Sequence, residues 1–442
     1  MTYLNELGLS IIGLLVISII LLPRRYAFLP LLVAVCYLTL GQTVILAGAN
    51  FHPVRILTLM GFVGLFFRMD HPKINFNRID CLVILWAVSS FTIYMIHEPD
   101  TISLIYRLGF LYDAVGLYFL SRFLIADLDD IRTVTKYACI IIVPMAIFMI
   151  IESSTGNNVF SYFGAVKEIS LTRDGSVRSQ GPFRHPILAG SFCASLIPLF
   201  LACWWQENGK IYASIGVLFA TVVVMTTQSS GPMLSFVAAV VVFSFWTIRD
   251  HVSKLAWVAL FAIVFLDVIM EAPFYYIIDR ISDLIGGSGW YRSYLIQQAI
   301  ERFDEWWLIG VSDTSKWMPF AIPGRVDFAD ITNQYIAEGV TGGLITMILF
   351  ILVITFCFKS IGRNIQSSHE LPLSDQMIYW SLGVSLTVHC VSFFSVSYFD
   401  QIIVIWYFLL ASISSLDSSS HTSHQGEAFD SLPQNGNQGD FK

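Results

Sequence analysis

The feature that most constrains this chain is a series of apolar blocks, each of about 20 residues, separated by short charged segments. A helix of that length crosses the hydrocarbon layer of a membrane, which is roughly 30 Å thick. No water is available there to bond exposed peptide groups, so each block must be helical. Only 13% of the 442 residues are charged, about half the usual fraction in a soluble domain. The sequence therefore predicts an all-α, polytopic bundle of transmembrane helices.

We expect thirteen spans, or twelve if the first, which begins with Asn5 and Glu6, does not cross. The expected spans are 4–22, 26–47, 53–67, 79–96, 104–123, 137–151, 186–205, 211–228, 232–248, 255–270, 338–358, 376–396 and 401–416. The basic residues of the short loops, from Arg24 and Arg25 through Arg363, all fall on one side if the N-terminus is outside. Because Lys and Arg accumulate on the cytoplasmic side, this pattern predicts a multi-pass protein of the bacterial inner (plasma) membrane with a cytoplasmic C-terminus.

Residues 1–416 then form the transmembrane domain, with long outer loops at 152–185 and 271–337, and 417–442 is predicted to be a disordered cytoplasmic tail. The later loop contains a predicted amphipathic helix at about 290–309. One face carries the apolar residues Tyr291, Leu295, Ala299, Phe303 and Trp306, and the other carries Arg292, Gln298, Arg302 and Glu305. Such a helix should lie on the membrane surface like a lid.

The cations differ between the two sides. The outer side carries nine Arg and only two Lys. A guanidinium is a planar fork that binds phosphate or carboxylate with two parallel hydrogen bonds, whereas an ammonium is a point charge. Four of these residues lie at a membrane boundary or on the amphipathic helix: Arg55, Arg107, Arg184 and Arg292. Charges so placed tend to line a cavity, and a ring of them would suit a lipid-linked pyrophosphate. The alternative is simple snorkelling to the interface.

Several motifs carry a resemblance. They are RSQGPFRHPILAG at 178–190, TQSSGPML at 227–234, Tyr291-Arg292, Gln298-Ala299, LIG at 308–310, DITNQYI at 330–336 and GVTGG at 339–343. In this order, on a many-span chain with one large late outer loop, they resemble the O-antigen ligase/polymerase family. The resemblance covers roughly residues 50–400.

The resemblance implies a metal-independent, membrane-embedded glycosyltransferase without a cofactor. It would move a sugar chain from an undecaprenyl-diphosphate carrier onto an acceptor hydroxyl. The partners are then the lipid-linked donor, a glycan or lipid-linked acceptor, the bilayer and other polysaccharide-assembly proteins, but no nucleic acid. Arg184 and Arg292 would stabilise the leaving diphosphate, and Asp330 would act as a base or orient the acceptor. The expected substrate-binding residues are Arg55, Arg107, Arg178, His185 and Asn333.

The chain departs from the ligase pattern in two places. The ligases carry a His just before the Asn of the late loop, where this chain has only Asp330-Ile-Thr-Asn333. The family also often has Arg after Ser in the hairpin between spans, where this chain has Ser230. Both departures favour an exopolysaccharide polymerase over a lipid A-core ligase. Asp330 could instead cap a helix, and His185, before Pro186, could be structural.

A transporter or flippase of the same lipid-linked oligosaccharide is the competing hypothesis. Alternating-access transporters usually show internal repeats and broken helices around polar residues at the membrane midplane. Here we find no convincing repeat, and polar residues accumulate at the outer edge, which favours a one-sided active site. All seven cysteines lie inside apolar blocks, so neither a disulfide framework nor a zinc site is expected.

Overall fold

The computed structural model describes residues 4–68, 74–173, 175–285, 289–318 and 329–430, and it leaves out the side chains of several residues within 252–263 and 281–285 and of all beyond 417. Two short antiparallel hairpins accompany the helices, β1 (Val44–Leu46) with β2 (Ala49–Phe51) and β3 (Leu171–Arg173) with β4 (Ser176–Arg178). The α-helices are α1 (Glu6–Leu21), α2 (Leu29–Tyr37), α3 (Pro53–Phe67), α4 (Arg78–His97), α5 (Thr101–Leu111), α6 (Leu117–Leu124), α7 (Leu128–Thr155), α8 (Pro186–Ala202), α9 (Lys210–Thr226), α10 (Ser230–Ser244), α11 (Val252–Ile269), α12 (Ile277–Ile285), α13 (Gly289–Glu301), α14 (Phe303–Trp306), α15 (Gln334–Ser367), α16 (Leu373–Ser392) and α17 (Ile403–Asp430).

The predicted fold class is confirmed. In the described part of the chain, six helical segments are long and apolar enough to cross a membrane, and four shorter apolar helices accompany them. The six are α4, the continuous α5–α6 segment, α7, α8, α10 with the turn that follows it, and α15. The chain is thus a multi-pass membrane protein, while the predicted number of twelve or thirteen spans remains a prediction.

One predicted span is wrong. Residues 26–47 do not form a continuous helix, because α2 ends at Tyr37 and the chain then becomes extended at Leu38. The hydroxyl of Thr39 and the amide of Gln42 both donate to the carbonyl of Phe163, at 3.0 and 2.7 Å. Gly41 packs so closely here that a Cβ atom would lie 2.5 Å from that same carbonyl oxygen. These contacts with a distant loop hold the segment in a turn, although its composition is apolar.

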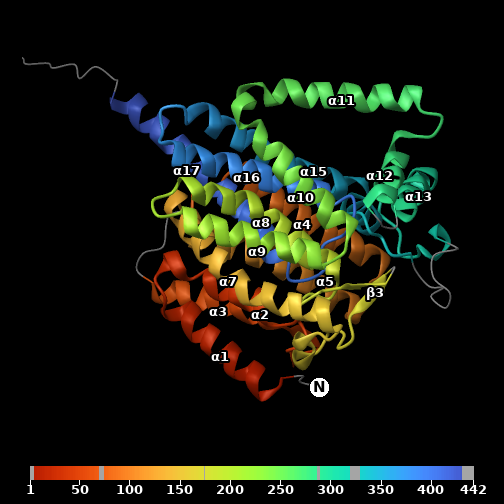
Figure 1. Ribbon diagram of the computed structural model, residues 1–442, viewed down its shortest axis with the longest axis horizontal. Helices are drawn as coiled ribbons and strands as arrows, with labels where there is room; N and C mark the ends of the chain where they lie inside the picture. Colours follow the sequence, from red (N-terminus) through yellow and green to blue (C-terminus); the bar gives the residue numbers. More distant parts are fainter. Residues whose placement is uncertain (1–3, 69–73, 174, 286–288, 319–328, 431–442) are drawn as a thin grey trace, which may run out of the picture.

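The helix ends form two groups (Figure 1). Three ion pairs join segments predicted to share the cytoplasmic side: Arg24–Asp130, Arg132–Asp375 and Arg363–Asp417. The other end, which we call the loop end, contains both long loops and the hairpins. Figure 1 shows it on the right, where β3, α12 and α13 lie, with the C-terminal part of α17 at the far left. Helix α11 runs apart from the other helices in the same view.

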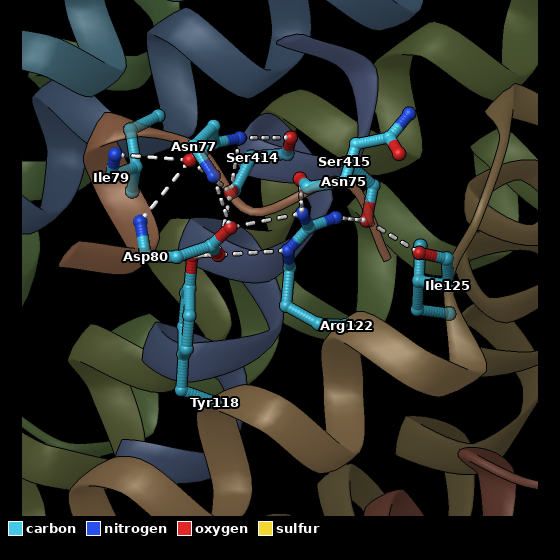
Figure 2. Close-up of polar contacts among 9 residues, drawn as sticks. All are labelled: Asn75, Asn77, Ile79, Asp80, Tyr118, Arg122, Ile125, Ser414 and Ser415. Carbon is cyan, nitrogen blue, oxygen red and sulfur yellow. Dashed lines mark hydrogen bonds and ion pairs between the residues drawn. The ribbon is translucent and has the colours of Figure 1, made fainter. Parts of the chain in front are cut away.

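A buried polar network ties α4, α6 and α17 together (Figure 2). Asp80 accepts hydrogen bonds from Tyr118 at 2.6 Å and from Nε of Arg122 at 3.0 Å. Arg122 also donates to Ser415 at 2.7 Å, and the backbone amide of Asn77 donates to Asp80 at 2.9 Å. Asp80 and Arg122 are both buried. Because each charge is paired and hydrogen-bonded, we interpret this network as structural.

Helix α15 is broken at Gly342 and Gly343, where the backbone leaves the helical conformation. The segment that follows α14 packs against this break. The amide of Val311 donates to the carbonyl of Val340 at 2.7 Å, and the amide of Leu344 donates to the carbonyl of Trp307 at 2.8 Å. The motifs at 308–310 and 339–343, distant in the sequence, therefore contact each other. This contact positions the first two turns of α15 at the loop end.

Replacing Gly343 by alanine is expected to destabilise the protein by about 1–3 kcal/mol. Its φ is +68°, and a Cβ atom there would lie 2.5 Å from the carbonyl oxygen of Leu308. Thermal unfolding in detergent measures the effect. Gly362, in the same helix, is the matched control, since a Cβ atom there meets nothing within 4 Å. Gly362→Ala should be neutral or slightly stabilising, and an equal loss from both variants would contradict the role of the break.

The predicted amphipathic helix of the late loop is only partly correct. It is divided into α13 and α14 by a non-helical residue, Arg302. Leu295 and Ala299 are buried as expected, but Arg292 and Gln298, predicted to lie on the polar outer face, are buried as well. The helix therefore does not present a purely polar side to solvent. Burial of Arg292 requires polar partners, which the site described below provides.

Two smaller predictions concern the cysteines and the tail. The seven cysteines are free, and Cys81 is exposed on α4, so it does not pack in the interior. Helix α17 continues to Asp430, so the structure shows helix in the first part of the predicted tail. Residues 431–442 lie outside the described residues, and the disorder of the tail remains a prediction.

Candidate functional site

Two buried arginines meet the turn between α9 and α10 at the loop end. Arg178, the last residue of β4, donates from Nη2 to the hydroxyl of Ser229 at 2.7 Å. Arg292, in the first turn of α13, donates from Nη1 to the hydroxyl of Ser230 at 3.3 Å. The next residue, Gly231, leaves no room for a side chain, since a Cβ atom would lie 2.5 Å from the hydroxyl of Ser395. Three segments distant in the sequence thus converge on one turn, which we call the arginine site.

Neither guanidinium has a carboxylate counter-ion among the described residues. Arg178 is 3% exposed and Arg292 is 7% exposed, and neither forms an ion pair with a carboxylate of the described residues. Burial lowers the pKa of each to about 10, with a further contribution from the positive charge of Arg173. Both remain protonated at neutral pH. Buried cations without partners are costly, so the arrangement is suited to an anion that arrives from outside.

A small cavity of about 50 Å³ adjoins Arg292. Its polar lining comes from Ser230, Ser282, Arg292 and Ser395, and its apolar lining from Leu234, Ile278, Val391 and Phe394. Hydroxyls and a guanidinium beside aliphatic and aromatic walls would match a phosphate group at the boundary between headgroup and hydrocarbon.

His185 lies at the entrance of α8 and acts as its N-cap. Its Nδ1 accepts a hydrogen bond from the backbone amide of Ile187 at 3.2 Å, and Pro186 occupies the first helical position. Burial lowers the pKa of His185 to about 4, and the charges of Arg178, Arg173, Lys167 and Arg292 add to the shift. The histidine is therefore neutral at physiological pH. The capping contacts agree with a structural role for His185. Its imidazole is also close enough to the arginine site for the charges of Arg178 and Arg292 to lower its pKa.

Arg55 and Arg184 line a second, larger cavity of about 330 Å³. Arg55 is paired with Asp113 through two hydrogen bonds, from Nε at 2.8 Å and from Nη2 at 2.6 Å. The side chain of Arg184 is exposed, and its backbone amide donates to Asp400 at 2.6 Å. Arg107 is buried, with its guanidinium carbon 3.6 Å from the centre of the Tyr94 ring. The expected ring is thus not formed: Arg55 and Arg184 line the larger cavity, Arg292 lies at the arginine site, and Arg107 lines neither cavity.

The late-loop residues differ from expectation in one respect. Asn333, predicted to bind substrate, is the N-cap of α15 and accepts a hydrogen bond from the amide of Ile336 at 3.2 Å. The alternative that Asp330 caps this helix is therefore wrong. Asp330 is exposed and lines neither cavity, and its carbonyl accepts a hydrogen bond from Tyr291 at 2.9 Å. Its role as a base remains a prediction without support from these contacts.

Sequence reasoning missed two buried carboxyl groups in the larger cavity, Glu338 and Asp400. Glu338 was expected to begin an apolar span, and its position opposite Trp86, 252 residues earlier, gives no local signal. Asp400 stands alone between two apolar segments. An acidic residue in a short outer loop is the only signal that could have identified it.

Comparison with known proteins bears on the same region. Residues 215–351 match the family described as O-antigen ligase, and no curated protein matches the chain. The matched part contains Ser229, Ser230, Arg292 and the break in α15, whereas Arg178, Arg184 and Asp400 lie outside it. With the bundle of apolar helices, this match supports a membrane protein similar to the O-antigen ligase/polymerase family, with a role in polysaccharide assembly.

Proposed function

We propose that this protein transfers or polymerises an undecaprenyl-diphosphate-linked oligosaccharide at the outer face of the bacterial inner membrane. The observation that carries the proposal is the arginine site, in which Arg178 and Arg292 are buried without carboxylate partners beside two serine hydroxyls. The site lies within and beside the segment that matches the O-antigen ligase family.

The chemistry follows from the charges. The glycosidic carbon of the donor bears a lipid diphosphate, and negative charge grows on that diphosphate as the bond breaks. Guanidiniums held in place before the reaction stabilise this charge more in the transition state than in the ground state. Arg178 and Arg292 are held by Ser229 and Ser230, which limits their reorganisation. We propose that these cations take the place that a metal ion has in other glycosyl transfers, so activity should persist in a chelator.

The polymerase alternative within this proposal rests on the departures from the ligase pattern. Ser230 occupies the position where the family often has Arg. Its hydroxyl accepts a hydrogen bond from Arg292, so an arginine from another segment lies beside this position. The late loop provides Asn333 as a helix cap and no histidine. A polymerase acting on an exopolysaccharide would use a glycan hydroxyl as acceptor. The larger cavity has room for a sugar that carries such a hydroxyl.

Purified protein in liposomes tests the proposal. Synthetic undecaprenyl-diphosphate oligosaccharide is supplied on the side of the loop end, and products are analysed by mass spectrometry with and without EDTA. Lengthened glycan supports transfer. Movement of the lipid across the bilayer without new glycosidic bonds would support the flippase alternative and overturn the proposal, as would thiol labelling that places residues 271–337 in the cytosol.

A further inference from the structure

The larger cavity at the loop end has the composition of a sugar-binding pocket. Aromatic side chains form much of its wall: Trp86, Tyr106, Phe110, Phe393, Tyr398 and Trp406. Polar groups that can bond hydroxyls lie between them: His52, Gln334, Glu338, Asp400 and Gln401. Aromatic faces pack against the C–H faces of a sugar ring, and amides and carboxylates bond its hydroxyls. The volume of about 330 Å³ is in the range of pockets that bind small molecules.

The carboxyl group of Asp400 is incompletely paired. The residue is 1% exposed. Its Oδ2 accepts the backbone amide of Arg184 at 2.6 Å, but its buried Oδ1 has no hydrogen-bond partner among the described residues. A buried acceptor without a donor costs about 1–3 kcal/mol. A ligand hydroxyl in the cavity would provide that donor.

Glu338 provides the contrast within the same cavity. Its Oε2 accepts a hydrogen bond from the indole of Trp86 at 2.8 Å, and its Oε1 accepts one from the amide of Gln334 at 2.7 Å. Both oxygens are therefore engaged by the protein. Of the two buried carboxyl groups, only Asp400 has an oxygen to which the described residues donate no hydrogen bond.

One loop separates this cavity from the arginine site. The segment between α16 and α17 contributes Phe394 and Ser395 to the small cavity beside Arg292. A few residues later it contributes Tyr398 and Asp400 to the larger cavity. The segment that carries Asp400 therefore also lines the small cavity beside Arg292.

We propose that the larger cavity binds the acceptor sugar and that Oδ1 of Asp400 takes the proton of its attacking hydroxyl. This inference rests on the proposed function. The hydroxyl oxygen forms a bond to the anomeric carbon of the donor as the bond from that carbon to the diphosphate oxygen breaks. The electron pair leaves on the diphosphate, which the arginine site stabilises, and the proton goes to Asp400.

The surroundings of Asp400 make its carboxylate a stronger base than an ordinary aspartate. Burial raises the pKa of its carboxyl group, and the amides of Arg184 and Gln401 and the charge of Arg184 offset part of the rise. The other titratable or charged groups that line the cavity are His52, Arg55, Tyr106, Asp113, Glu338, Tyr398 and Tyr407. As the pH falls through this raised pKa, Asp400 becomes protonated and can no longer accept a proton. We therefore expect kcat to decrease toward acid, with an apparent pKa above the ordinary aspartate range.

Asp400→Asn in the liposome assay tests the inference. The amide keeps the shape but cannot accept the proton, so turnover should fall about 100-fold or more, while KM for the lipid-linked donor stays within about threefold of wild type because the arginine site is unchanged. Asp304→Asn, at an exposed outer position, is the matched control and should retain wild-type rates. Asp400→Glu, which restores a carboxylate, should recover part of the activity.

The outcomes separate the two proposals. If the wild-type protein makes no new glycosidic bond, the proposed function fails. If the wild type is active and Asp400→Asn keeps a third or more of its turnover, the acceptor inference is overturned. Should Asp400→Asn fail to fold, as judged by thermal unfolding, the wild-type pH profile decides. A decrease in kcat toward acid with an apparent pKa above the ordinary aspartate range supports the inference, and a flat profile overturns it.

Discussion

Replacing Arg292 by alanine should abolish polysaccharide formation while leaving the protein expressed in the membrane. The guanidinium is buried beside Ser230 and has no carboxylate partner among the described residues, so its charge is available for the leaving diphosphate. Loss of one such electrostatic contact typically lowers kcat about 10²–10³-fold. Arg292→Lys keeps the charge but loses the planar fork, and it should retain only part of the activity. Polymer can be measured by gel analysis of cells in which the variant replaces the native protein.

Arg302→Ala is the matched control for Arg292→Ala. Arg302 belongs to the same loop, but it is paired with the neighbouring Glu305 at 2.9 Å on the surface, and its removal should leave polymer formation unchanged. Arg184→Ala should also abolish activity. Because Arg184 holds Asp400 through its backbone amide, this substitution removes only the guanidinium and leaves that contact in place. Normal polymer from both Arg184→Ala and Arg292→Ala would contradict the site assignment.

Breaking the buried pair of Asp80 and Arg122 should have the largest effect on stability. Arg122→Met would leave the Asp80 carboxylate buried within the network of Figure 2 without its cation. Such a change typically costs about 3–5 kcal/mol. The loss should appear as a lower midpoint of thermal unfolding in detergent and as reduced expression.

Two comparisons sharpen the stability measurement. Arg302→Met breaks a surface pair with Glu305 and should change stability by less than about 1 kcal/mol. The double variant Asp80→Leu, Arg122→Met removes both charges together, so it should be more stable than Arg122→Met alone. Equal stability of Arg122→Met and wild type would show that the network does not hold α4, α6 and α17 together.

The sequence indicated several parts of the site before their contacts were known. The motif at 178–190 provides Arg178, and the motif at 227–234 provides Ser229 and Ser230, which the structure joins to Arg178 and Arg292. These residues could be found because their types and their placement at the ends of apolar blocks are unusual. Their mutual contacts could not be found, since Arg178 and Ser229 are 51 residues apart and local pattern carries no information on such pairs.

The prediction of Asp330 and the omission of Asp400 have the same physical cause. Both are single acidic residues in outer segments next to an apolar block, so composition cannot distinguish them. Packing does, because Asp330 is exposed while Asp400 is enclosed between the entrance of α8 and the aromatic wall of the larger cavity. The difference in burial therefore comes from the tertiary structure, and both catalytic roles remain to be tested.

The amino-acid sequence by itself determined that this chain is a multi-pass membrane protein, because long apolar blocks must be helical where no water can bond the peptide groups. It also predicted that guanidiniums gather on one side of the membrane, since that expectation depends only on the order of spans and charges along the chain. The tertiary structure alone decided that Arg55 is paired with Asp113 and Arg122 with Asp80, whereas Arg178 and Arg292 lack a carboxylate partner among the described residues. Whether a charge is neutralised depends on which distant segment packs against it, and that choice is made by the fold.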